Sequence, residues 1–282
     1  SYTFEAQISN GEIIETKNIN LNITDIKGDE FRVNTETFDS QNHPRVTSLN
    51  DGGYIIIWES SGDQDGANSG VFGQKYNALS IPVDEEFQVN TYFQSSENPE
   101  DLVTLNNGGF LAIYRETGGG IGQYSDVLAQ SYDSLGNTDG NEFLVNSTTD
   151  RDQEDASGAS LKDGNYVVVW WSNGDLDGSK GGIFGQLYNS NGNLVGGEFQ
   201  VNTQFVGHQN NPNVISLNDG GFLVTWSSNS AFGGEDGIFS QRFFPNGNVD
   251  IVKVLIKAGG NVNQARTTDG ASPLWIASQN GN

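Results

Sequence analysis

The sequence contains no cysteine and no methionine, and its basic residues are few. Without cysteine, neither disulfide bonds nor thiolate metal sites can form. Thirteen lysine and arginine residues stand against 36 acidic ones, for a formal net charge of −23. This balance excludes the basic surface that nucleic acids and anionic membranes require. No apolar run approaches the roughly 18 residues that span a bilayer, so we expect no membrane insertion.

The same absences bear on origin and location. Residues 1–10 lack the apolar stretch of a signal peptide, and no methionine stands even at position 1. We therefore expect a mature product or an excised fragment. Secreted eukaryotic proteins often carry disulfides, whereas many exported bacterial repeat proteins carry none. The composition favours a secreted or cell-surface protein of bacterial origin.

Glycine and aromatic residues are abundant, although the hydrophobic fraction is only 34%. The 37 glycines suit tight turns between many short strands. The 16 Phe, 9 Tyr and 5 Trp residues are distributed along the chain and are sufficient to build a core. The composition predicts an ordered, all-β protein.

One unit of 56 residues occurs four times in the centre of the chain. The pattern Glu-Phe-x-Val-Asn begins at Glu30, Glu86, Glu142 and Glu198. Two further features keep this spacing. A leucine before a glycine-containing turn occurs at Leu49, Leu105, Leu161 and Leu217. An aromatic residue ends an apolar run at Trp58, Tyr114, Trp170 and Trp226. This register over four copies indicates a repeat architecture.

Each unit is predicted to form four strands, at about residues 30–35, 44–49, 54–59 and 71–76 in the first copy. Four short strands per repeat are typical of a β-propeller blade. Stacked β-sandwich modules are the alternative, but each would need about 100 residues. We predict a β-propeller, of four blades or part of a larger one. If four blades do not close a ring, the open edge requires further repeats or an oligomer.

The flanking segments differ from the repeat, so we divide the chain into residues 1–27, 28–248 and 249–282. The first segment alternates apolar and polar residues around an Asn-Gly turn, which predicts a β-hairpin. It resembles the end of a cadherin-like or immunoglobulin-like module. In the last segment, Ser272–Ala277 resembles the signature of an ankyrin repeat, which implies a short α-helical tail.

Acidic loops between the third and fourth predicted strands are candidate calcium sites. Asp63 and Asp65 precede a glycine in the first copy, Asp175 and Asp177 do so in the third, and Asp236 remains in the fourth. Alternate carboxylates on a bent loop can face one ion, with carbonyl oxygens completing its shell. The alternative is an Asx turn in solvent, where Asp and Gly are favoured for backbone reasons.

Three further residues are candidate ligand contacts because they depart from the repeat. Trp171 follows the repeated tryptophan, so strand alternation directs it to the opposite face. His43 and His208 lie in matching loops of the first and fourth copies. No nucleophile elbow, zinc-binding helix or phosphate loop occurs. The sequence does not exclude a pair of carboxylates for glycoside hydrolysis, because 36 acidic residues form many pairs by chance.

The repeat resembles the tandem repeats of large exported bacterial proteins, namely adhesins and calcium-binding proteins of the RTX type. The matching segments include Glu198–Thr203 and Asp219–Trp226. This resemblance implies surface display and a binding role. We therefore predict a non-catalytic extracellular scaffold for adhesion or ligand recognition, with calcium as a candidate stabiliser and an extracellular glycan or protein as partner. The alternatives are a lectin, a polysaccharide-processing enzyme and a passive spacer. Function should lie where the copies differ.

Overall fold

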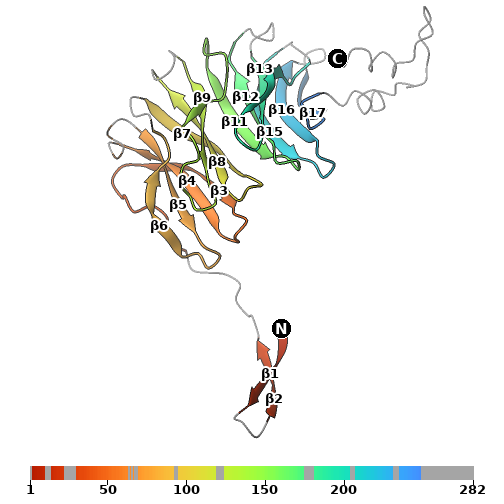
Figure 1. Ribbon diagram of the computed structural model, residues 1–282. Helices are drawn as coiled ribbons and strands as arrows, with labels where there is room; N and C mark the ends of the chain where they lie inside the picture. The colour runs from red at the N-terminus through yellow and green to blue at the C-terminus, as the bar shows by residue number, and fades with distance from the viewer. Residues whose placement is uncertain are drawn as a thin grey trace, which may run out of the picture. The chain divides into compact units, whose positions relative to one another are not determined.

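The computed structural model describes residues 2–9, 14–21, 30–62, 64, 66, 69–91, 95–118, 124–174, 181–203, 207–230 and 235–248. The chain divides into two compact units, Ser1–Thr35 and Glu36–Asn282. In the first unit, β1 (Tyr2–Ser9) pairs antiparallel with β2 (Ile14–Leu21) (Figure 1). The predicted ankyrin-like tail, residues 249–282, lies outside the described residues. The described part contains no helix suited to crossing a membrane.

The described strands of the second unit form four antiparallel groups, which we call blades one to four (Figure 1). One parallel bridge, between Ser69 and Ser96, joins the first two groups into a single eight-stranded sheet. Blade one contains β3 (Gln41–Ser48), β4 (Tyr54–Ser61), β5 (Ser69–Tyr76) and β6 (Pro82–Gln88). Blade two contains β7 (Ser96–Thr104), β8 (Phe110–Thr117), β9 (Asp126–Tyr132) and β10 (Phe143–Leu144). Blade three contains β11 (Gln153–Ser160), β12 (Tyr166–Ser172), β13 (Gly182–Tyr188) and β14 (Leu194–Gln200). Blade four contains β15 (Gln209–Ser216), β16 (Phe222–Ser230) and β17 (Glu235–Phe243). The predicted all-β propeller fold is confirmed.

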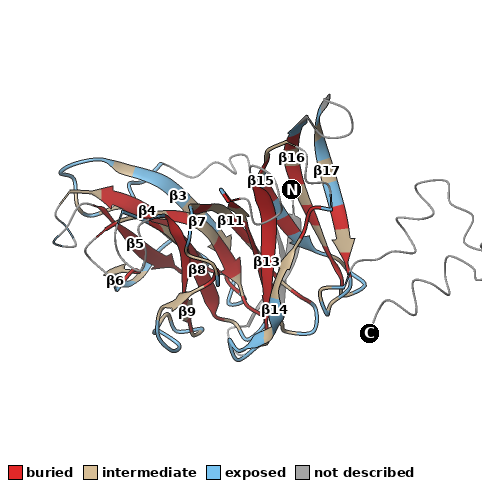
Figure 2. Ribbon diagram, turned by 90° about the horizontal axis from the view of Figure 1, so that it is seen from above, coloured by how far each residue is buried: buried red, intermediate tan, exposed pale blue. Residues whose placement is uncertain are grey.

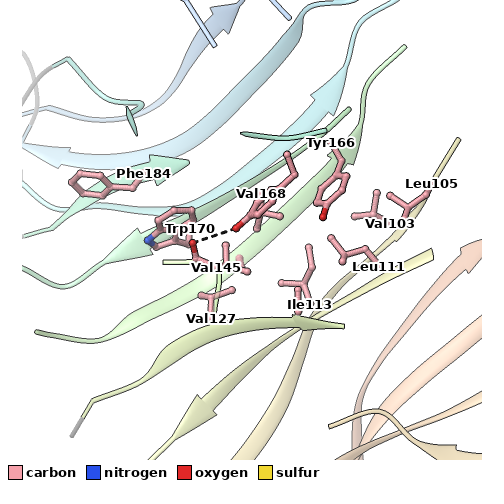
Figure 3. Close-up of a cluster of buried hydrophobic side chains, with 13 residues drawn as sticks. Val103, Leu105, Leu111, Ile113, Val127, Val145, Tyr166, Val168, Trp170 and Phe184 are labelled. Atoms are coloured by element: carbon pink, nitrogen blue, oxygen red, sulfur yellow. Dashed lines mark hydrogen bonds between the residues drawn. The ribbon is translucent and has the colours of Figure 1, made fainter. Parts of the chain in front are cut away.

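The first strands of the blades lie next to one another, β3 beside β7, β7 beside β11 and β11 beside β15. We call them the inner strands. Apolar side chains fill the spaces between successive blades, and buried residues run along the second and third strands of the blades, as in β4 and β8 (Figure 2). Between blades two and three, Ile113, Val127, Val168 and Trp170 belong to one such cluster (Figure 3). A single 56-residue unit has no core of its own, and neighbours supply it.

The phase of the repeat differs from the prediction. Glu-Phe-x-Val-Asn does not open a blade. In three copies, the first residues of the motif end the fourth strand of the preceding blade, which we call the outer strand. Phe87 does so in β6 and Phe199 in β14. The first copy, at residues 30–34, is not a strand, and Phe31 is 52% exposed. Blade four has three strands in its described residues. The alternation of Phe and Val predicts a strand correctly but does not say which strand of the blade it is.

The motif asparagine has a specific role at the end of each outer strand. The Oδ1 atoms of Asn90, Asn146 and Asn202 accept the backbone N–H of the residue 19 positions earlier, at 2.9, 2.8 and 2.8 Å. The Nδ2 of Asn202 donates to Gln209 Oε1 at 3.3 Å, at the start of the next inner strand. Each asparagine is buried. Each side chain thus satisfies a buried backbone N–H group of the third strand. Asn202 in addition positions the start of the following blade.

The motif glutamate connects successive copies of the motif. Glu142 Oε2 accepts the backbone N–H of Thr91 at 2.8 Å, and Glu198 Oε2 accepts that of Ser147 at 2.9 Å. Thr91 and Ser147 directly follow the motif asparagines of the preceding copy. The repeated residues therefore serve the attachment of one blade to the next.

Replacing Asn202 by alanine should lower the free energy of unfolding by about 1–3 kcal/mol, because the buried N–H of Ile183 loses its acceptor. Urea denaturation of both proteins measures this difference. Asn141→Ala, at an exposed position, is the control and should leave the midpoint nearly unchanged. Equal midpoints for wild type and Asn202→Ala would refute the role of the asparagine.

Gly158 allows the inner strands of blades two and three to approach closely. A Cβ at this position would lie 2.5 Å from Val103 Cγ2 and 2.7 Å from Ile113 Cδ1. Gly158→Ala should therefore destabilise the protein by about 1–3 kcal/mol through overpacking. Gly197→Ala is the matched control, since nothing lies within 4 Å of its added methyl group. Thermal denaturation of the two variants distinguishes them, and similar melting temperatures would contradict this packing argument.

Candidate functional site

Every inner strand carries a β-bulge at the same place in the repeat. The register with the second strand shifts between Asn42 and Arg45 in blade one, at the corresponding positions of blades three and four, and between Pro99 and Asp101 in blade two. His43, Asp155 and Asn211 have positive φ values of 49°, 54° and 51° at these bulges. A bulge redirects the side chains beside it. The bulged ends of the inner strands are therefore where this fold can present side chains to a ligand.

The four copies of the repeat carry side chains of very different chemistry at the bulged ends of the inner strands. The last residue within the register shift is Pro44, Glu100, Ala156 or Pro212, and the first residue back in register is Arg45, Asp101, Ser157 or Asn213. The second strands contribute Glu59, Arg115, Trp171 and Ser227 at one repeat position. Their partners across the ladder are Asn42, Asn98, Glu154 and Asn210. Packing cannot explain such variation, whereas a single asymmetric ligand site can.

Arg115 joins two carboxylates from neighbouring blades. Its Nη1 lies 3.1 Å from Glu154 Oε2, and its Nε lies 3.6 Å from Glu100 Oε1. The Nε is buried and has no hydrogen-bond partner among the described residues. Arg45 Nε donates to the backbone carbonyl of Glu100 at 2.6 Å. The charged group therefore extends over blades one, two and three.

Burial raises the pKa of Glu100 from 4.5 to about 7. The guanidinium of Arg115 opposes this shift, while the charge of Asp155 adds to it. Burial also raises the pKa of the neighbouring Asp101, although Gly158 N–H donates to its carboxylate at 2.9 Å. Near neutral pH both the protonated and the ionised form of Glu100 are therefore populated, so that its carboxyl group can donate a proton or accept one.

Two of the predicted ligand residues, His43 and Trp171, lie at or beside the bulged ends of the inner strands, and the third, His208, directly precedes an inner strand. His43 Nδ1 is 2.7 Å from Glu59 Oε2. Trp171 is half-buried against the cluster between blades three and four, and its Nε1 is enclosed without a hydrogen-bond partner in the described residues. His208 precedes β15, and its backbone N–H donates to Asn229 Oδ1 at 2.8 Å.

The predicted calcium ligands are mostly outside the described residues. Asp63, Asp65, Asp175 and Asp177 fall there, whereas Asp236 is exposed in β17. Within the described ranges, no group of three or more His, Cys, Asp or Glu side chains could hold a metal ion. Calcium at the acidic loops stays a prediction.

Sequence reasoning missed Glu100, Arg115 and Glu154. The available indication was that a charged residue stands in one copy where other copies carry a neutral one, at repeat positions in or beside the inner strand. Pro99-Glu100-Asp101 has the composition of a turn, and only the pairing of β7 with β8 places it inside a strand with a bulge. Trp171 and His43 depart from the repeat in the same layer and were found for that reason.

A separate cavity of about 280 Å³ lies at the opposite ends of the strands, between blades two and three. Its lining includes Asp139, Asn141, Tyr166 and Asn191. It contains none of the bulge residues, so it is distinct from the carboxylate group around Arg115.

Glu100→Gln should change how stability depends on pH. The folded protein keeps the proton of Glu100 up to about pH 7, whereas the unfolded chain releases it near 4.5. The free energy of unfolding of the wild type should therefore fall as pH rises through this window, by on the order of 3 kcal/mol relative to Glu100→Gln. Urea denaturation of both proteins between these two pH values measures the difference. A constant difference across the window would show that the pKa of Glu100 is not raised.

No family model and no curated protein matches the sequence. Among solved structures, the chain is similar to the GH93 α-L-arabinofuranosidase of Fusarium graminearum with arabinobiose, with a TM-score of 0.54, 10% identity and coverage of 83% of this chain and 68% of that chain. It is also similar to an α-L-arabinanase of Penicillium chrysogenum complexed with arabinobiose, with a TM-score of 0.52, 13% identity and coverage of 83% and 69%. At such identities the similarity shows the propeller fold alone.

The predicted relationship to adhesin and RTX-type repeats is wrong, since the structural neighbours are an arabinofuranosidase and an arabinanase. The physical reason lies in the motif itself. Its glutamate and asparagine bind backbone groups within and between blades. These residues specify attachment of one blade to the next, and they carry no information on surface display or adhesion.

Proposed function

We propose that the chain is a polysaccharide-processing enzyme that hydrolyses glycosidic bonds. This replaces the predictions of a non-catalytic adhesion scaffold and of a chain without enzymatic activity, because the similar solved structures are an arabinofuranosidase and an arabinanase. The observation that carries the proposal is the joining of Glu100 and Glu154 by Arg115 at the bulged ends of the inner strands.

The chemistry of this group suits glycoside hydrolysis. Such enzymes use one carboxylic acid of raised pKa to protonate the leaving oxygen, and a second carboxylate on the other side of the sugar. Glu100 has the properties of the acid, since burial raises its pKa to about 7. Glu154, ion-paired with Arg115, supplies the carboxylate that activates water in inverting enzymes or attacks the anomeric carbon in retaining ones.

The substrate we propose is an extracellular glycan containing arabinose. Both neighbours were solved with arabinobiose. Amide side chains, which can recognise sugar hydroxyls, occur at the same level of the repeat: Asn98 of β7 lies across the ladder from Arg115, and Asn213 of β15 occupies the repeat position of Asp101. An extracellular polymeric substrate also agrees with the predicted secreted or cell-surface location.

The test is release of reducing sugar from arabinan, arabinoxylan and xylan by the full chain. Glu100→Gln and Glu154→Gln should each lower kcat by roughly 10²–10⁴-fold, the typical contribution of a positioned acid or base. Glu85→Gln, at an exposed position of β6, is the control and should retain full activity. In the wild type, kcat should fall as pH rises above about 7, when Glu100 loses its proton.

Two results would refute the proposal. One is the absence of turnover by the folded wild type on all three glycans. The other is activity that Glu100→Gln and Glu154→Gln both retain, because the hydrolysis would then belong to a different site.

A further inference from the structure

Blade two contains a row of three acidic residues that has no counterpart in the other blades. Glu97 of β7 pairs with Glu116 of β8, and Glu116 pairs with Asp126 of β9. The corresponding rows in the other blades are Gln41–Ser60–Gly70, Gln153–Ser172–Gly182 and Gln209–Ser228–Gly237. A neutral row has thus become an anionic one in a single copy of the repeat.

All three side chains are buried. Glu97, Glu116 and Asp126 are 1%, 3% and 1% exposed. Residues paired directly across antiparallel strands point to the same face of a sheet. Tyr114 and Leu128, two residues along the strands from Glu116 and Asp126, belong to the cluster between blades one and two. The acidic row therefore faces blade one.

The hydrogen bonds to this row leave two carboxylates incompletely satisfied. Asn90 Nδ2 and Ser95 Oγ donate to the two oxygens of Glu97. Asn146 Nδ2 donates to Asp126 Oδ1 at 2.7 Å. In the described part of the chain, both Glu116 oxygens and Asp126 Oδ2 are buried without any hydrogen-bond partner.

The electrostatic environment does not compensate these charges. No ion pair involves Glu116 or Asp126 within the described ranges. Burial raises the pKa of Asp126, and the charges of Glu116 and Asp152 raise it further. Burying unpaired carboxylates is costly, so positive charge or protons must neutralise them.

We propose that Glu116 and Asp126 bind a divalent cation that prefers oxygen ligands. The two carboxylates balance its charge and offer three oxygen atoms that accept no hydrogen bond from any described residue. Because no three acidic or histidine side chains of the described residues form a cage, neutral oxygen ligands complete the shell, as is common for such ions. This site is separate from the acidic loops predicted from sequence. It lies between two blades, where a bound ion would stabilise their attachment.

The repeat itself supplies the test variants. Glu116→Ser and Asp126→Gly restore the residues of the other three blades, so both should fold. Melting temperatures of the full chain are measured with CaCl₂ or MgCl₂ and with EDTA, and calorimetric titration counts the ions bound. In the wild type, a divalent ion should raise the melting temperature by several degrees. Both variants should lose this shift, lose one bound ion, and melt above the wild type in EDTA.

Glu85→Gln removes an exposed carboxylate and controls for the screening of surface charges by added salt. The ions should shift its melting temperature as much as they shift that of the wild type. The proposal is overturned if neither ion shifts the wild-type melting temperature. It is also overturned if the shift and stoichiometry persist in Glu116→Ser. If the melting temperature depends on pH but on neither ion, Glu116 and Asp126 share a proton instead of a cation, and the proposal is again overturned. Activity on glycans is not used, so this result is independent of the proposed hydrolysis.

Discussion

Each described outer strand is followed by a buried asparagine whose amide oxygen holds the third strand of the same blade. A unit of this size cannot bury both faces of its sheet, so the unit is stable only with neighbours in register. At the end of each outer strand, an amide oxygen accepts the N–H of the third strand, as Asn202 does from Ile183. In the same copy, the amide nitrogen reaches Gln209 at the start of the next inner strand. One side chain thus closes a blade and aligns its successor.

Because these attachments are repeated, other positions are free to differ. At the bulged ends of the inner strands, residues with left-handed backbone conformation redirect the neighbouring side chains. There the copies carry Pro44, Glu100, Ala156 and Pro212 at a single repeat position. A symmetric scaffold can hold an asymmetric site in this way, with the repeated residues supplying rigidity and the variable ones the chemistry.

Much of the fold could be predicted from the sequence, because the 56-residue spacing of apolar and turn residues follows from the way the blades pack. The all-β class and the propeller follow from the 56-residue period. The phase could not be predicted, since the partner of the motif asparagine is a backbone N–H 19 residues away. The site was found only in part. Trp171 and His43 interrupt visible patterns, whereas Glu100 acquires its raised pKa from burial and neighbouring charges that only the tertiary structure brings together.

Strand β8 shows how one element can serve two different charged groups. Arg115 and Glu116 are adjacent, and strand alternation directs them to opposite faces. On one face, Arg115 compensates Glu100 and Glu154 with its own charge. On the other, Glu116 and Asp126 have no such partner among the described residues. The first arrangement pairs its carboxylates with a cation of the chain itself, whereas the second leaves them to be neutralised by a bound cation or by protons. The two groups are therefore chemically independent, although a single peptide bond joins them.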